Sequence, residues 1–215
     1  MPLAGRGYRV QLVDPVPLHV EQARQAAACG PVASYAAALG DARELPAAAQ
    51  SQDAVLLFAP LYQLTGLTGL AGRPRALAEA GRVLRPGGRL LAVAISRFAS
   101  AARRAAPGLA GRPGLPADRG TGPGRRPAPQ SHPAARLEFF TTAYYHTPDG
   151  LAGEVRQAGF TGPAVYGTEG PGWPLLQDGA DPPRREQILF AARSVETQPA
   201  LLGFSLHLLA AAAKA

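Results

Sequence analysis

The sequence predicts an α/β fold in which a doubly wound, mostly parallel sheet is covered by helices on both faces. Three observations predict it. Short apolar runs alternate with helical patterns along the 215 residues. Two of these runs, 53–58 and 89–95, are almost wholly apolar, as is typical of parallel strands buried on both faces. Short loops follow the strand ends, as connected strand and helix units require.

The first strand is expected over 8–14, a β-branched run that ends in Asp14. Pro15 and Pro17 suit the start of a helix, which we expect over 19–29 because Gly30 and Pro31 stop it. A second strand is expected over 32–39, although alanines dilute its β propensity.

The middle of the chain predicts a strand, a helix and a strand. The run 53–58 ends at Pro60, and the helix over 73–84 carries its apolar residues on one face at three- and four-residue spacing. The segment 85–88, Arg-Pro-Gly-Gly, is expected to end that helix before the strand over 89–95.

The last third predicts an ordered segment over 137–145 and a helix that begins at 147–149 and ends at 158–159. A strand over 160–166, a helix over 183–195 and a final apolar strand over 201–213 follow. The final strand is expected to run antiparallel to the others.

One segment has the composition of a loose insertion. Residues 107–133 hold seven prolines and six glycines, which removes amide donors and adds backbone entropy. We therefore expect a single domain over 1–215 with a disordered Pro/Gly/Arg-rich insertion at about 103–135.

The net charge of +7 and the pI of 10.3 raise the question of nucleic-acid binding. Between residues 97 and 136 the sequence has eight arginines and one acidic residue, Asp118, so the whole excess of positive charge lies in this stretch. No aromatic residues are interleaved for base stacking, so a solvated loop is favoured over a nucleic-acid partner.

The sequence predicts neither a membrane segment nor a metal site. No window reaches about 18 uncharged apolar residues, and the first ten residues lack the pattern of a secretory signal, which favours a cytoplasmic protein. Cys29 is the only cysteine, without the His/Cys spacing of a zinc site. We expect it to be a small buried apolar group.

In doubly wound sheets, ligands bind beyond the carboxyl ends of the strands. Here those ends are at Asp14-Pro15, at Asp41-Ala42, at 58–60 and after Ile95. Chemistry is therefore expected at these four places.

The chain resembles the class I S-adenosylmethionine-dependent methyltransferases, which are Rossmann-like enzymes. The segments that carry the resemblance are YRVQLVD at 8–14, GDAREL at 40–45, DAVLLFAPLYQL at 53–64, EAGRVLRPGGRLLAVAIS at 79–96 and FFTTAYYHTPDGLAGEVRQAGF at 139–160. An acid that ends a second strand also occurs in NAD enzymes, so the order and spacing of the segments matter more than any one of them.

The resemblance implies that S-adenosylmethionine is the cofactor and that Asp14 accepts hydrogen bonds from both of its ribose hydroxyls. Asp41 would accept a hydrogen bond from the exocyclic amine of adenine. The amide of Ala42 would donate one to a ring nitrogen. Pro15 and Leu45 would sandwich the ring, with plain core packing as the alternative for either residue. The alternatives are a helix cap for Asp14 and an Asx-turn at Gly40-Asp41.

The resemblance also implies that Phe58 and Ala59 line the methionine end of the cofactor. Relatives often have G-P-L-Y-H where this chain has Ala59 to Gln63, so the first glycine and the last histidine of that pattern are replaced. The replacements put in doubt a close backbone approach at the first place and any role for the histidine at the last. Tyr62 is a candidate for the pocket wall, with a packing aromatic as the alternative.

Methyl transfer needs little beyond placement, because a sulfonium methyl group is already activated. A base helps when the acceptor must lose a proton. His146, beside Tyr144 and Tyr145, is a candidate for that base, with a structural histidine as the alternative. Glu169 and Trp173 form a second possible lid.

The family's glycine-rich loop, of G-x-G-x-G type, does not precede Asp14. The letters recur at Gly120, Gly122 and Gly124, but no buried strand precedes them. We therefore expect a methyltransferase without its first strand and loop, from a misplaced start codon or a true truncation. Its strands over 8–14 and 53–58 would then carry unpaired edges.

The predicted function is methyl transfer from S-adenosylmethionine to an unidentified small-molecule acceptor. The alternative is an inactive, methyltransferase-like remnant that acts as a binding module. An NAD-dependent oxidoreductase ranks third, because the chain has no Tyr-x-x-x-Lys pair and a single lysine, Lys214. Oligomeric state is not predicted.

Overall fold

The computed structural model describes residues 3–29, 35–65, 72–99, 130–131, 142–172 and 181–215. Three predictions lie wholly or mostly outside these residues: the insertion at about 103–135, the glycine triplet at 120–124 and a lid containing Trp173. Within the insertion, Gln130–Ser131 (β5) pairs antiparallel with Thr142–Ala143 (β6).

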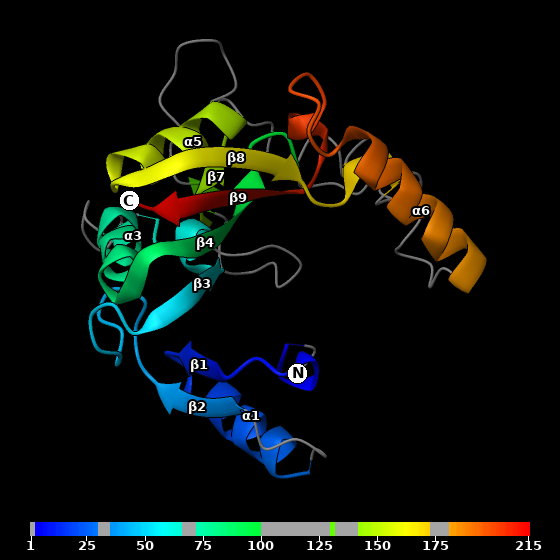
Figure 1. Ribbon diagram of the computed structural model, residues 1–215. Coiled ribbons are helices and arrows are strands. Elements are labelled where there is room, and N and C mark those ends of the chain that lie inside the picture. Colours follow the sequence, from blue (N-terminus) through cyan, green and yellow to red (C-terminus); the bar gives the residue numbers. More distant parts are fainter. Residues whose placement is uncertain (1–2, 30–34, 66–71, 100–129, 132–141, 173–180) are drawn as a thin grey trace.

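The N-terminal part of the chain forms a two-stranded parallel sheet with one helix. β1 (Val10–Asp14) and β2 (Tyr35–Leu39) pair in register, with Asp14 opposite Leu39. α1 (Pro17–Cys29) connects them, as the two prolines and the Gly-Pro stop predict. This N-terminal unit lies below the rest of the molecule in Figure 1.

The main sheet has five strands in the order β3-β4-β9-β8, with the short β7 paired to the end of β4. β4 is parallel to β3 and β7, and β9 is antiparallel to both β4 and β8. The strand bounds are Gln52–Phe58 for β3, Leu84–Ser96 for β4, Tyr145–His146 for β7, Phe160–Gly167 for β8 and His207–Lys214 for β9. The predicted Rossmann-like α/β class with an antiparallel C-terminal strand is thereby confirmed.

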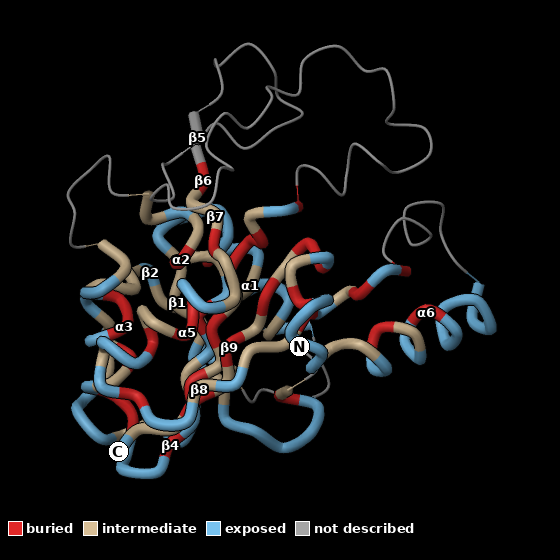
Figure 2. The backbone as a smooth tube through the Cα atoms, turned by 90° about the horizontal axis from the view of Figure 1, so that it is seen from above, coloured by how far each residue is buried: buried red, intermediate tan, exposed pale blue. Residues whose placement is uncertain are grey.

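Two helices of this part begin at capping residues. Thr147 accepts the Gly150 amide at the start of α5, and Asp181 accepts the Arg184 amide at the start of α6. The helix bounds are Pro60–Gln63 for α2, Gly72–Val83 for α3, Pro148–Gln157 for α5 and Pro182–Val195 for α6. α6 extends away from the sheet (Figure 1) and is mostly exposed (Figure 2).

The hydrophobic core lies in the main sheet. It joins β3, β4 and β9 to α3 and α5 through residues at most 8% exposed, among them Leu77, Leu90, Leu151, Val155 and Leu208. Alternation along β4 and β9 turns one face of each strand toward these helices. Figure 2 shows buried stretches along the same elements.

Two strand edges are left unpaired among the described residues. β1 pairs only with β2, and β3 pairs only with β4, so no ladder joins the two sheets. Leu56 and Phe58 on β3 are 38% and 56% exposed. These are the two strands for which buried, unpaired edges are expected, and on β3 these two side chains are exposed rather than buried.

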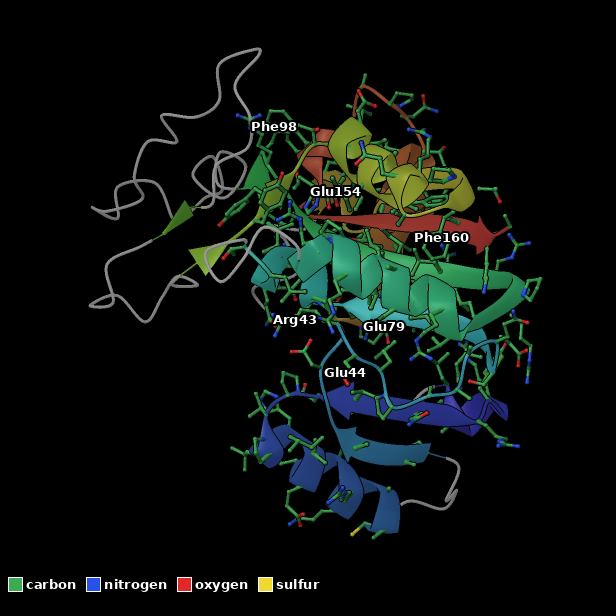
Figure 3. All side chains as sticks on the ribbon, turned by 90° about the vertical axis from the view of Figure 1, so that its left-hand side faces the viewer. Arg43, Glu44, Glu79, Phe98, Glu154 and Phe160 are labelled. Carbon is green, nitrogen blue, oxygen red and sulfur yellow. The ribbon has the colours of Figure 1, made fainter. Side chains whose placement is uncertain are left out.

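The loop between β2 and β3 attaches the N-terminal unit to α3. The Leu45 amide donates to Glu79, and the Arg82 guanidinium donates to the carbonyls of Leu45 and Ala47, at distances of 2.9–3.0 Å. Figure 3 shows Arg43 and Glu79 in the space between α3 and the N-terminal strands.

Three expectations need correction. Residues 85–88 belong to β4, and the predicted turn occurs as a bulge, with Gln52 opposite Leu84 and Ala54 opposite Arg89. Residues 201–206 are not strand: Leu202–Phe204 is a 3-10 helix (η3), because this corner turns back onto β4. Cys29 is exposed, because α1 buries only Val20 against its small sheet.

Candidate active site at the carboxyl ends of the strands

Asp14 lies at the carboxyl end of β1, with its side chain 32% exposed. Its Oδ1 accepts the Val16 amide at 2.8 Å and lies 3.2 Å from His19 Nδ1. The carboxylate therefore forms an Asx-turn where the chain leaves the strand, just ahead of the helix that begins at Pro17. No described residue donates to Oδ2, so this oxygen is open to a ligand.

Asp41 comes two residues after β2, beside Asp14. The Gly40 amide donates to the Asp14 carbonyl at 3.1 Å, which holds the two strand ends together. Asp41 Oδ1 accepts the Arg43 amide at 2.8 Å, so the Asx-turn is present. The guanidinium of Arg43 also binds both carboxylate oxygens, at 2.9 and 2.6 Å.

This ion pair favours the ionised form of Asp41. The hydrogen bond from the Arg43 side chain is the largest cause that lowers the pKa of Asp41 below its usual range. A ligand amine would share the ionised carboxylate with Arg43. Ala42 is half-buried and packs against the main core, and Leu45 is half-buried, whereas Pro15 is exposed.

Ala59 has a backbone conformation that glycine favours. It follows β3 with a φ of 115° and precedes α2, and the amides of Tyr62 and Gln63 donate to its carbonyl. A side chain at such a φ costs about 1–3 kcal/mol. Alanine thus stands here in a backbone conformation that glycine would adopt with less strain.

Tyr62 packs on the second hydrophobic cluster, beside Ile95 and Ala143. Burial raises the pKa of its hydroxyl, which is therefore neutral near pH 7. The packing alternative describes this ring well, and its carbonyl accepts the Tyr144 amide at 2.8 Å. Phe58, by contrast, is 56% exposed.

His146 is 1% exposed and belongs to a buried charged cluster. Its Nε2 lies 3.4 Å from Glu154 Oε2, and Arg73 binds the same carboxylate through two nitrogens at 3.0–3.2 Å. The Arg73 guanidinium also lies 3.5 Å from the centre of the Tyr144 ring. His146 Nδ1 has no hydrogen-bond partner among the described residues.

Glu154, labelled in Figure 3, is ionised in this cluster. Burial acts to raise its pKa, but the hydrogen bonds from His146 and Arg73 outweigh it and lower the pKa to about 2. The arrangement connects α3, α5 and β7, and an imidazole this deeply buried cannot touch a ligand without a local rearrangement. The geometry favours the structural alternative for His146.

A second glutamate and histidine meet where β8 ends and β9 begins. Glu169 was predicted as part of a lid, but its partners Ser205 and His207 were not predicted. Nothing in the local sequence indicates the contact, because Glu169 and His207 are 38 residues apart. Arg73 and Glu154, 81 residues apart, were missed for the same reason.

The described residues offer neither a membrane-spanning helix nor a cluster of metal ligands. No helix among them has the length and apolar character needed to cross a bilayer. No group of three or more His, Cys, Asp or Glu side chains in that part of the chain is placed to hold a metal ion.

Comparisons with known proteins indicate which family the chain resembles. Residues 1–92 match the family model of a methyltransferase domain. No curated protein sequence matches the chain.

Solved structures of S-adenosylmethionine-dependent methyltransferases share the fold. One from Methanosarcina mazei is 18% identical with a TM-score of 0.57, over 99% of this chain and 85% of the other. A protein from Listeria monocytogenes, described as a putative member, is 14% identical with a TM-score of 0.59, over 96% and 80%. A third, from Mesorhizobium loti, is 16% identical with a TM-score of 0.52, over 95% and 79%.

The sequence match covers β1, β2 and β3 with their carboxyl ends, and the structural match covers almost the whole chain. The predicted resemblance is confirmed, and S-adenosylmethionine is the cofactor that it indicates. Residues 1–92 of the chain are similar to the methyltransferase domain family, and the fold is that of the class I S-adenosylmethionine-dependent methyltransferases.

Proposed function

We propose that the chain binds S-adenosylmethionine over the carboxyl ends of β1, β2 and β3 and transfers its methyl group to a small molecule. The observation that carries the proposal is the placement of Asp14 and Asp41 at the ends of two paired parallel strands. Two carboxylates at neighbouring strand ends can contact separate parts of one nucleoside.

Asp14 would accept the ribose hydroxyls. A carboxylate has two oxygens and about four acceptor positions, so the contacts to Val16 and His19 leave capacity for both hydroxyls. Hydrogen bonds to a charged group contribute about 1.5–3 kcal/mol each. Asp14 is therefore expected to supply a large part of the affinity.

Asp41 and Ala42 would bind the adenine, between Pro15 and Leu45. The Arg43 guanidinium keeps Asp41 ionised, so the carboxylate accepts and never donates. Phe58 and Ala59 would lie at the methionine end. The strained backbone at Ala59 supports this placement, since strain gathers where a ligand is held.

The chemistry of the cofactor is an activated methyl group, which the protein needs only to align with the acceptor. Tyr62 lies next to this end and presents a neutral side chain. We place Tyr62 in the wall of the acceptor site and His146 in the framework behind it. A small, soluble molecule is the expected partner, in a cytoplasmic setting.

The second candidate function is a methyltransferase-like binding module without activity. The break between β1 and β3 among the described residues favours it, because the cofactor would have to bridge two sheets that share no ladder. Arg43 binds the carboxylate of Asp41 and would compete with the adenine amine for it, which also favours a module without activity.

Isothermal titration calorimetry with S-adenosylhomocysteine separates the two candidates. The proposal predicts saturable heat with one site per chain. Homocysteine, which lacks the adenosine, should give no heat. Absence of heat with S-adenosylhomocysteine, in a chain whose circular dichroism shows the folded state, would contradict the proposal and favour the binding-module alternative.

A further inference from the structure

A carboxylate, a hydroxyl and an imidazole meet at the corner between β8 and β9. Glu169 Oε2 accepts the Ser205 hydroxyl at 2.7 Å and the His207 amide at 3.0 Å, and Oε1 lies 2.5 Å from His207 Nδ1. The Ser205 oxygen in turn accepts the amides of Glu169 and Gly170 at 2.8 and 3.3 Å. Glu169 is therefore held rigidly against the ring.

These contacts determine which nitrogen of His207 carries the proton. Burial acts to raise the pKa of Glu169, but the hydrogen bonds from His207 and Ser205 lower it to about 2, so the carboxylate is ionised. An ionised carboxylate only accepts, and Nδ1 must donate to it. In the neutral ring the lone pair is then on Nε2.

The Nε2 atom is accessible. The side chain of His207 is 36% exposed, and Nε2 has no hydrogen-bond partner in the part of the chain that the structure describes. It also differs from His146 Nδ1, the one side-chain atom of these residues that is both buried and unpartnered. A glutamate-held imidazole with an accessible lone pair has the geometry of a general base.

His207 lies at the end of the sheet where the acceptor is proposed to bind. His207 pairs with Ile95 near the carboxyl end of β4, at the same edge of the sheet as the end of β3. Two exposed aromatic rings lie at this corner, Phe98 at 45% and Phe204 at 53% exposure, and the Phe98 ring packs on Gly203. Figure 3 shows Phe98 just beyond the end of β4. Exposed rings beside a base favour an apolar molecule with one polar group.

We propose that His207 is the general base of the methyl transfer, that Glu169 is its positioning residue, and that the acceptor is a hydroxyl group on a small apolar or aromatic molecule. This inference rests on the proposed function. The hydroxyl proton passes to Nε2, and the oxygen forms a bond to the methyl carbon. The electron pair of the broken carbon–sulfur bond stays on sulfur, which gives a methyl ether and S-adenosylhomocysteine. Glu169 stabilises the imidazolium that results.

The test uses para-nitrophenol as the acceptor probe, because its phenolate absorbs in the visible range and its neutral form does not. The full chain, with and without S-adenosylhomocysteine, is titrated below the pH at which the free phenol ionises. We expect a phenolate band on binding. His207→Gln should reduce the band to the level of free para-nitrophenol, because the glutamine amide can still donate to Glu169 but cannot take up a proton.

Three further variants separate positioning from folding. Glu169→Gln should weaken the band, and Glu169→Asp should restore part of it. His146→Gln removes the other glutamate-bound imidazole, so it should lower the melting temperature and leave the band in place. A nitrogen–proton correlation spectrum of the unliganded chain should show the Nδ1–H form of His207.

A band that is absent, or that persists in His207→Gln, overturns the proposal, as does an Nε2–H form of His207. The proposed function fails separately, by absence of heat with S-adenosylhomocysteine in the same samples. In that case, the phenolate band measured without S-adenosylhomocysteine and the nitrogen–proton correlation spectrum still test the role of His207.

Discussion

The N-terminal unit and the main sheet differ in how firmly they are packed. Among the described residues, the fifteen buried members of the main hydrophobic cluster all lie between 57 and 212. In β1, α1 and β2, Val20 alone is buried. The residues proposed to hold the nucleoside are thus on the thinly packed part, and the acceptor side is on the part that carries the stability. Such a division implies that ligand binding and folding are coupled mainly in the N-terminal unit.

The largest expected effect tests the packing difference itself. Leu90→Ala removes a side chain that is 0% exposed from the centre of β4 and should lower the free energy of unfolding by about 3–4 kcal/mol. Leu12→Ala, in half-buried β1, should cost about 1 kcal/mol. Equal losses in urea unfolding would show that the two parts are packed alike.

Acid should weaken the main sheet before the N-terminal unit. The pKa of Glu154 and of Glu169 is about 2 when folded and 4.5 ordinarily, so the unfolded chain binds more protons between these values. Their contribution, up to about 3 kcal/mol each, is complete above pH 4.5 and is lost as the pH falls toward 2.

Unfolding measured against pH checks this expectation. Glu154→Gln should flatten the acid limb, whereas Glu186→Gln, on the exposed face of α6, should leave it unchanged. An identical acid limb in all three proteins would show that the buried cluster does not contribute.

Cofactor binding should stabilise the N-terminal unit more than the sheet. A ligand at about 100 times its dissociation constant stabilises the state that binds it by about 2.7 kcal/mol. Hydrogen exchange with S-adenosylhomocysteine should therefore slow the amides of β1 and β2 and leave β9 unchanged. Equal slowing in both sheets would contradict the proposed division.

The smallest effect concerns the junction of the two parts. Ala59→Gly should stabilise the chain by about 1 kcal/mol, because glycine adopts a φ of 115° without strain. Ala54→Gly, within β3 and without such a φ, should destabilise it by about as much. Thermal unfolding distinguishes the opposite signs.

The sequence predicted the elements better than the contacts between them. Periodicity and caps located the strand that ends at Asp14 and the helix that begins after Thr147, because these signals are local. The bulge at 85–88 was missed because its Gly-Gly pair fits a helix stop equally well. The exposure of Cys29 was missed because it depends on how little of α1 packs against the small sheet.

The candidate site divides in the same way. Asp14 and Asp41 follow from strand ends and a family pattern, both visible in the sequence. The pairs Glu154–Arg73 and Glu169–His207 form only when distant elements pack, so no local pattern marks them. The carboxylates could be predicted, but their partners could not.

The most direct measurement of the central claim is the affinity for S-adenosylhomocysteine of Asp14→Asn against Asp53→Asn. Both substitutions remove one carboxylate charge from a strand, but Asp53 is at the amino end of β3, is 85% exposed and pairs only with Arg85. We predict that Asp14→Asn weakens binding by about 10- to 100-fold and that Asp53→Asn leaves it unchanged. Equal affinities for the two variants would contradict the placement of the ribose on Asp14.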